Sequence, residues 1–226
     1  MEPTTVKICG VRRFEDALVA AQAGADYFGM VFVPGRRRRV EPEAARAITD
    51  GMRAIGPDAP KSVGLFGDQP LDEVLDKIAT AGLDYVQLCG EESLDFCRVV
   101  LDQAGVIKVL HVSDEDHTGA VTELADRIDI FISAGCTVTL DSQVVGLHGG
   151  TGQSFDWRIA AQLAAEGRRF LLAGGLTPDN VAEAVAVVHP WGVDVSSGVE
   201  TDGVKDPAKI RQFVANARQA GSSAGG

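Results

Sequence analysis

Short apolar runs alternate with segments whose apolar residues recur at helical spacing, and this alternation continues along nearly the whole chain. Continuous apolar runs predict parallel strands that are buried on both faces. Between them, stripes such as Leu71-Val74-Leu75-Ile78 and Val181-Ala184-Val185-Val188 predict amphipathic helices. The predicted strands are Val6–Cys9, Tyr27–Phe32, Lys61–Phe66, Tyr85–Leu88, Ile107–Val112, Asp129–Ile132, Phe170–Ala173 and Gly192–Val195.

Prolines mark the expected helix starts and glycines the expected helix ends. The starts are Glu41-Pro42, Asp68-Gln69-Pro70, Thr177-Pro178 and Asp206-Pro207, and the ends are Gly24, Gly82, Gly105 and Gly167. Strict alternation of eight strands with about eight helices favours an α/β protein with a single (β/α)8 TIM barrel over an open doubly wound sheet. We expect residues 1–220 to form this barrel and residues 221–226 to form a flexible Gly/Ser tail.

The sixth strand has two possible positions. If it is Asp129–Ser133, it ends without an acidic residue, and Asp141 lies in a long loop that must fold back over the barrel mouth. If it is Val138–Asp141, the apolar run before it needs a different structure. The position of this strand therefore decides whether Asp141 stands on a rigid element.

Charge and composition exclude several classes of partner. The 226 residues carry a formal net charge of −11, whereas a nucleic-acid-binding protein needs a basic face. No apolar run approaches the roughly 18 residues of a membrane span, and the N-terminus has no signal-sequence pattern. The four cysteines lack the spacing of a metal site, which predicts reduced thiols in a cytoplasmic protein without a metal.

Candidate chemistry follows the predicted strands, at the barrel edge where sites collect. Cys9 ends the first strand, where a thiol is either a proton carrier or nucleophile, or a small buried apolar residue. Gly174-Gly175 and Ser196-Ser197-Gly198 follow the last two strands, where barrels often bind phosphate through backbone N–H groups. Without a ligand, the same sequences are simply tight turns.

Two further loops carry possible binding groups. Arg36-Arg37-Arg38-Arg39 follows the second strand; such runs are usually solvated, but this position suits one guanidinium for a substrate carboxylate. Gly149-Gly150-Thr151-Gly152 precedes a predicted helix at Ser154–Ala165 and either makes a sharp turn or contacts the substrate through its backbone.

Several of these motifs occur in one order along the chain, which resembles the phosphoribosylanthranilate isomerase family of tryptophan biosynthesis nearly end to end. The motifs are Lys7-Ile8-Cys9-Gly10, the arginine loop, Gly149-Gly150-Thr151-Gly152, Ala173-Gly174-Gly175-Leu176, Asp194-Val195-Ser196-Ser197-Gly198-Val199-Glu200 and Val204-Lys205-Asp206-Pro207. The resemblance implies an Amadori rearrangement of N-(5-phosphoribosyl)anthranilate to 1-(2-carboxyphenylamino)-1-deoxyribulose 5-phosphate. This chemistry needs one acid and one base and no cofactor.

The resemblance also implies a role for each candidate residue. Cys9 matches the family's base, which can take a proton as a thiolate if the local field lowers its pKa, and Asp141 matches the acid. Lys7, two residues before Cys9 on the same strand face, can help electrostatically. The binding residues implied in the same way are Arg38 for the anthranilate carboxylate, Asp194 for the sugar hydroxyls or a structural role, and Gly174, Gly175, Ser196, Ser197 and Gly198 for the phosphate.

One departure from the family and two rival functions stay open on the sequence. Cys89 stands where the family usually has a histidine, and a thiol cannot carry the positive charge of an imidazole. The rivals are a histidine-pathway or dual-substrate phosphoribosyl isomerase, which has aspartate at the base position, and a non-catalytic barrel that only binds a phosphorylated ligand. For any of them we expect a monomer or a homodimer.

Overall fold

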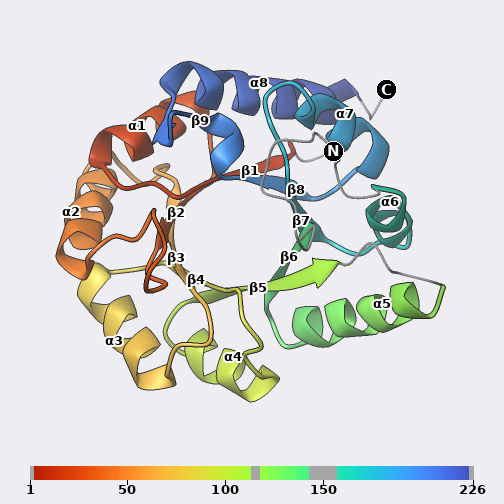
Figure 1. The fold of residues 1–226 in the computed structure, drawn as a ribbon, viewed down its shortest axis with the longest axis horizontal. Helices are drawn as coiled ribbons and strands as arrows, with labels where there is room; N and C mark the ends of the chain where they lie inside the picture. The colour runs from red at the N-terminus through yellow and green to blue at the C-terminus, as the bar shows by residue number, and fades with distance from the viewer. Residues whose placement is uncertain (1–2, 113–117, 143–156, 224–226) are drawn as a thin grey trace.

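The predicted barrel is confirmed: in a computed structural model, eight parallel strands pair in chain order and β8 pairs with β1 to close the ring. The structure describes residues 3–112, 118–142 and 157–223. Figure 1 looks into the ring and shows the helices around its outside. The strands are β1 (Thr5–Cys9), β2 (Tyr27–Val31), β3 (Lys61–Phe66), β4 (Tyr85–Leu88), β5 (Gly105–Val112), β6 (Thr137–Ser142), β7 (Phe170–Ala173) and β8 (Gly192–Val195).

Each strand of the barrel is followed by a helix. Gly24 and Gly82 take the left-handed conformation and end α1 and α3, as predicted, because that conformation costs glycine little. The helices are α1 (Phe14–Ala23), α2 (Pro42–Arg53), α3 (Leu71–Ala81), α4 (Leu94–Leu101), α5 (Thr118–Ser133), α6 (Trp157–Ala165), α7 (Val181–Val188) and α8 (Pro207–Ser223).

The prediction of a strand at Asp129–Ile132 is wrong, and the later of the two possible positions is the correct one. Asp129–Ile132 lies inside α5, and β6 is Thr137–Ser142. The buried residues of α5 include Leu124, Ile128 and Phe131, which recur at helical spacing, while Ile130 is half exposed. Asp141 therefore stands near the carboxyl end of a barrel strand rather than in a long loop.

Several element boundaries differ from the prediction. The helix start expected at Thr177-Pro178 lies at Val181, the first residue of α7. Gly105 does not end a helix, because α4 ends at Leu101 and Gly105 is the first residue of β5. Gly105 lies against the ring of Tyr85, which a β-carbon there would overlap. At the other end of the chain, α8 continues to Ser223, so it includes the first three residues of the expected tail.

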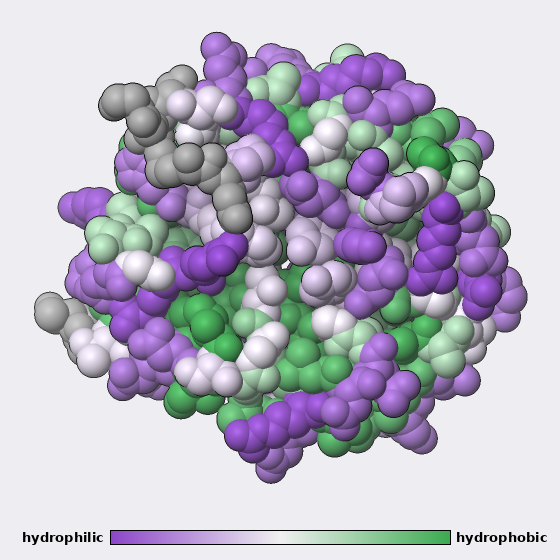
Figure 2. Space-filling view, turned by 180° about the vertical axis from the view of Figure 1, so that it is seen from behind, coloured by the Kyte–Doolittle hydropathy of each residue, from purple (hydrophilic) through white to green (hydrophobic). Residues whose placement is uncertain are grey.

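Apolar side chains form a cluster inside the barrel. Successive strand residues point to opposite faces, so alternate positions turn inward. This inner cluster is separate from the larger core between strands and helices. Its buried members are Cys9, Val31, Val63, Leu65, Ile107 and Leu171. Figure 2 shows the face opposite to that in Figure 1, where polar side chains surround and interrupt exposed apolar groups.

A small hairpin follows the last barrel strand. A short 3-10 turn, η1 (Ser197–Val199), leads into β9 (Glu200–Thr201), which pairs antiparallel with β10 (Val204–Lys205). Asp202 and Gly203 connect the two strands with positive φ angles of 50° and 76°, as a two-residue hairpin turn requires. This hairpin holds Glu200 and Lys205 directly opposite each other.

Candidate active site

A cavity of about 720 Å3 opens at the carboxyl ends of the strands. This volume is in the range of small-molecule sites. Its lining includes all the residues predicted to act as acid or base or to bind the carboxylate, sugar and phosphate: Cys9, Arg38, Asp141, Gly174, Gly175, Asp194, Ser196, Ser197 and Gly198. Since these residues come from β1, β6, β8 and three loops, the fold brings together groups that lie far apart in the chain.

Cys9 ends β1 with its side chain in the inner cluster and only 5% of its surface exposed. Gly29 on the neighbouring strand leaves room for the sulfur, since a β-carbon there would lie 3.2 Å from Sγ. Burial raises the pKa of the thiol, and the positive charges of Lys7 and Lys205 only partly oppose this effect. The condition that the local field lowers the Cys9 pKa is therefore not met in the ligand-free protein, because desolvation outweighs the charges of the two lysines.

Lys7 and Asp194 form an ion pair inside the barrel, between the first and the last strand. Lys7 Nζ lies 2.7 Å from Asp194 Oδ2, and the lysine side chain is fully buried. Burial opposes the lysine charge, yet Asp194 and Cys9 together hold the Lys7 pKa above its ordinary value. The other oxygen, Asp194 Oδ1, is buried and accepts no hydrogen bond from the described residues. Lys7 is thus a permanent cation beside the thiol, and Asp194 keeps a free acceptor.

Asp141 lies three strands away from Cys9 around the ring, at the same mouth. Burial raises its pKa, and the nearby Asp194 adds to the effect, while His111 and Lys7 oppose it. A carboxyl group that keeps its proton toward higher pH is suited to donate a proton as a general acid. Its place on β6 gives it the rigid support that a loop position would lack.

The loops after β7 and β8 are in direct contact with each other. Gly174 and Gly175 have positive φ angles of 93° and 63°, which glycine adopts at little cost. Gly198 passes so close to the Leu176 carbonyl that a β-carbon at residue 198 would overlap its oxygen. The two loops thus line one part of the cavity, together with Ser196 and Ser197. Loops in these two positions often bind phosphate through backbone N–H groups in barrels of this type, and we call the pair the phosphate cradle below.

Arg38 reaches the cavity from the loop between β2 and α2. Its guanidinium binds Glu200 in a bidentate pair, with Nε 2.6 Å from Oε1 and Nη2 3.1 Å from Oε2. Gly10 makes room for the arginine, because a β-carbon at that position would meet Arg38 Cδ at 2.5 Å. The structure therefore places Arg38 at the mouth, already paired with an acidic residue.

Three other sequence predictions concern metal binding, membrane spans and the glycine segment before the sixth helix. In the part of the chain that the structure covers, no group of three or more His, Cys, Asp or Glu side chains is placed to hold a metal ion. The same residues contain no helix long and apolar enough to cross a membrane. Gly149-Gly150-Thr151-Gly152 and the start of the helix predicted at Ser154–Ala165 lie outside the described residues; its described part is α6.

Comparison with known proteins decides the family. The family model described as N-(5'phosphoribosyl)anthranilate (PRA) isomerase matches residues 6–216. A relative from Pelobacter propionicus, named N-(5'-phosphoribosyl)anthranilate isomerase, is 45% identical over 215 residues, which cover 95% of each chain. The chain belongs to the N-(5'-phosphoribosyl)anthranilate isomerase family.

Solved structures of N-(5'-phosphoribosyl)anthranilate isomerases agree with this result. The enzyme from Thermotoga maritima superimposes with a TM-score of 0.81 at 36% identity, covering 96% of this chain and 99% of that one. A second structure, at 34% identity and a TM-score of 0.78 with the same coverage, holds reduced 1-(o-carboxyphenylamino)-1-deoxyribulose 5-phosphate. The family's barrel is therefore shared over nearly the whole chain.

Within this isomerase fold, the structure adds lining residues that the sequence motifs did not single out. Gln87 and His111 line the same cavity. His111 Nε2 lies 3.2 Å from the Cys89 carbonyl oxygen, and Nδ1 is buried without a hydrogen bond to any described residue. Burial raises the pKa of Cys89, the residue at the family's usual histidine position, to about 12. His111 on β5 thus supplies an imidazole beside the position where the chain has Cys89.

Proposed function

We propose that Asp141 and Cys9 carry out the acid and base steps of the Amadori rearrangement in this isomerase of tryptophan biosynthesis. The observation that carries the proposal is that both residues line one cavity together with the two glycine- and serine-containing loops. A carboxyl group with a raised pKa and a thiol beside a buried lysine supply an acid and a base without a cofactor.

The substrate would bind by its two anionic ends. Its phosphate suits the cradle of Gly174, Gly175 and Ser196–Gly198, where backbone N–H groups can donate hydrogen bonds to an anion. Its anthranilate carboxylate suits the Arg38 guanidinium. Asp194 Oδ1, which accepts no hydrogen bond from the described residues, can accept one from a sugar hydroxyl.

Ring opening uses the proton of Asp141. Asp141 gives this proton to the furanose ring oxygen as the C1–O bond breaks. The electron pair of the C1–O bond stays on the oxygen. The anthranilate nitrogen shares its lone pair with C1 to form a protonated Schiff base. Burial disfavours the charged carboxylate, so Asp141 keeps its proton to a higher pH than an exposed carboxyl group would. The proton is therefore available for the ring oxygen.

The base step uses the thiolate of Cys9. The sulfur takes the C2 proton, the C–H electrons form the C1–C2 double bond, and the nitrogen recovers its lone pair. The resulting enolamine becomes the ketone when C1 gains a proton and the C2 hydroxyl loses one. A proton then passes from the thiol to Asp141 through solvent, which restores both groups. Lys7 stabilises the thiolate whenever Cys9 ionises.

Two rival functions are less well supported. The family model and the relatives named above are N-(5'-phosphoribosyl)anthranilate isomerases, which favours that substrate over the histidine-pathway substrate. A barrel that only binds phosphate would need neither Cys9 nor a buried, proton-retaining Asp141. The oligomeric state, monomer or homodimer, and the cytoplasmic location stay predictions; sedimentation of the purified protein measures the first.

Turnover of N-(5'-phosphoribosyl)anthranilate by purified variants tests the proposal. Cys9→Ala and Asp141→Asn should each lower kcat by about 10²-fold or more, because each removes a proton-transfer group. Asp129→Asn is the matched control, since this carboxylate pairs with Arg168 on the surface, 2.9 Å away. Equal activity of the Cys9→Ala variant and the wild type would remove the base assignment. A larger loss in Asp129→Asn than in Asp141→Asn would remove the acid assignment.

A further inference from the structure

Glu200 lies next to the cavity, although it is not among the residues that line it, and it pairs with more cations than any other carboxylate that the structure describes. Its side chain is only 6% exposed. It accepts hydrogen bonds from Arg38 Nε and Nη2, from Arg37 Nη2 at 2.6 Å and from Lys205 Nζ at 3.1 Å. Three cations thus surround one carboxylate, and the cluster keeps an excess of positive charge beside a site for an anionic substrate.

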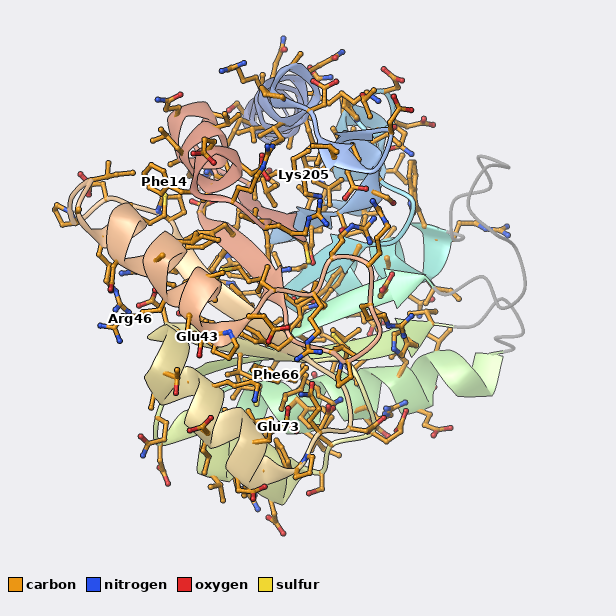
Figure 3. The ribbon with its side chains drawn as sticks, turned by 60° about the vertical axis from the view of Figure 1, so that its left-hand side comes forward. Phe14, Glu43, Arg46, Phe66, Glu73 and Lys205 are labelled. Carbon is orange, nitrogen blue, oxygen red and sulfur yellow. The ribbon has the colours of Figure 1, made fainter. Side chains whose placement is uncertain are left out.

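The cluster joins the two loops that would hold the two ends of the substrate. Arg37 and Arg38 belong to the loop between β2 and α2, and Arg37 Nη1 also donates to the Gly203 carbonyl at 2.5 Å. Lys205, labelled in Figure 3, donates to the Ser196 carbonyl at 2.7 Å from its place in the β9–β10 hairpin. One carboxylate therefore connects the arginine loop to the phosphate cradle.

The hydrogen bonds to Glu200 leave one N–H edge of the Arg38 guanidinium available. A guanidinium has five N–H groups in a fixed plane, and Glu200 takes one from Nε and one from Nη2. No described residue accepts a hydrogen bond from Nη1. The remaining edge, formed by Nη1 and the second N–H of Nη2, has the spacing that binds a second carboxylate in a bidentate pair.

We propose that Glu200 is a positioning residue for substrate binding: it holds Arg38 with its free edge available for the anthranilate carboxylate and, through Lys205, fixes the phosphate cradle. This inference rests on the proposed function. Hydrogen bonds from Arg38 and Arg37 outweigh burial and lower the pKa of Glu200 to about 2, so the carboxylate stays charged throughout the range of an activity assay.

The sign of the change in KM separates positioning from a simple charge effect. If Glu200 only neutralised its neighbours, Glu200→Gln would add positive charge near an anionic substrate and lower KM. If Glu200 positions Arg38 and Lys205, the same variant frees two long side chains that must be ordered again on binding. We expect KM to rise about tenfold, with kcat within about threefold of wild type, since ordering one such side chain alone costs up to roughly tenfold in affinity.

The experiment measures kcat and KM for Glu200→Gln, Arg38→Met and the double variant, with melting temperatures recorded in parallel. In the Arg38→Met background, Glu200→Gln should raise KM much less than it does in the wild type, because its main route of action is gone. Glu166→Gln is the control: it makes the same charge change at an exposed carboxylate that pairs with Arg168, and its KM should equal that of wild type.

Wild-type turnover tests the proposed function, whereas only the ratios between variants test the role of Glu200. A lower KM in Glu200→Gln, or equal effects of that substitution with and without Arg38, overturns the inference. If Glu200→Gln melts below the assay temperature, Glu200→Asp takes its place, with the same expected direction because the shorter side chain cannot reach all three cations. An unchanged KM in a folded Glu200→Asp also overturns the inference.

Discussion

Cys9 and Asp141 depend on burial in opposite ways. Burial makes Asp141 a better acid at neutral pH because it keeps the proton on the carboxyl group. The same effect makes the Cys9 thiolate scarcer but more basic once it forms. Lys7 lies on the same strand face and partly compensates, since its positive charge favours the thiolate. The buried ion pair of Lys7 with Asp194 keeps that charge in place.

The raised pKa of Asp141 predicts a trade-off between stability and activity. A carboxyl group whose pKa is raised by folding stabilises the folded state fully below the unfolded value near 3.8, and this contribution is lost as pH rises through the folded pKa. At neutral pH, Asp141→Asn removes the cost of a buried ionisable group while it removes the acid. We expect this variant to lose kcat and to be at least as stable as wild type in urea unfolding at pH 7.

The pH dependence distinguishes this explanation from a simple packing effect. The difference in unfolding free energy between Asp141→Asn and wild type should be smallest well below the unfolded pKa near 3.8, where the wild-type carboxyl is protonated in both states. It should then grow in favour of the variant as pH rises. The exposed Asp95→Asn variant, on α4, serves as control and should show no such growth. A variant that is less stable than wild type by the same amount at every pH would indicate lost packing instead.

At the scale of elements, the two loops that we propose to bind phosphate touch each other because glycine leaves the space for it. Gly198 lies against the Leu176 carbonyl, and even a methyl group at that position has no room. We expect Gly198→Ala to push the loops after β7 and β8 apart, which would raise KM by roughly tenfold or more, since displacements of about 1 Å at a site are costly. Steady-state kinetics with the phosphorylated substrate measures the effect.

Gly167→Ala is a suitable control for that experiment. Gly167 also has a positive φ, 88°, but it follows α6 and has open space around its α-carbon. Its substitution should cost about 1 kcal/mol of stability and leave KM unchanged. If both variants changed KM equally, backbone strain in general rather than contact between the two loops would explain the result.

The elements show how far the sequence pattern leads and where it stops. Most strands were predictable because parallel strands buried on both faces form continuous apolar runs. The pattern was misleading at Asp129–Ile132, since a short apolar run in a helix and one in a strand look alike without the contacts of the folded chain. Once β6 is known to be Thr137–Ser142, the predicted acid falls at its carboxyl end, as the position of sites in barrels requires.

The site residues show the same limit. Their place in the cavity lining agrees with the prediction: Cys9 and the two glycine- and serine-containing loops follow strand ends, whereas Arg38 and Asp141 were singled out by the family resemblance. Glu200 lies in one of the same motifs, but its role depends on ion pairs to arginines more than 160 positions earlier in the chain. His111 carries the same signal as Cys9, since it lies near the carboxyl end of a predicted strand, but it belongs to none of the motifs that were singled out.

On the scale of the whole molecule, two buried ion pairs connect different strands and loops of the barrel. Lys7 and Asp194 join the first strand to the last. Lys108 and Glu92 join β5 to the loop after β4, with Nζ 2.8 Å from Oε2 and both side chains almost fully buried. Glu92 also accepts hydrogen bonds from the backbone N–H groups of Gly90 and Asp68, which connects the loop after β3.

The Lys108–Glu92 pair predicts strong non-additivity in stability. Lys108→Met leaves a buried carboxylate without its cation, which should cost about 3–5 kcal/mol of unfolding free energy. Glu92→Gln should likewise be costly, because it leaves a buried ammonium group. The double variant should lose clearly less than the two single losses added together, since neither charge is then left alone. Urea unfolding of the four proteins gives the coupling energy.

Glu73 and Lys77 provide the matched comparison, because they form an ion pair of the same residue types, 3.3 Å apart along α3, with Glu73 more than a third exposed. Solvent screens such a pair, so the same pair of substitutions there should couple by no more than about 1 kcal/mol. A coupling energy for Lys108 and Glu92 as small as that would mean that water or backbone groups compensate each buried charge separately. The loops after β3 and β4 would then be held at the cavity mouth by packing and not by this ion pair.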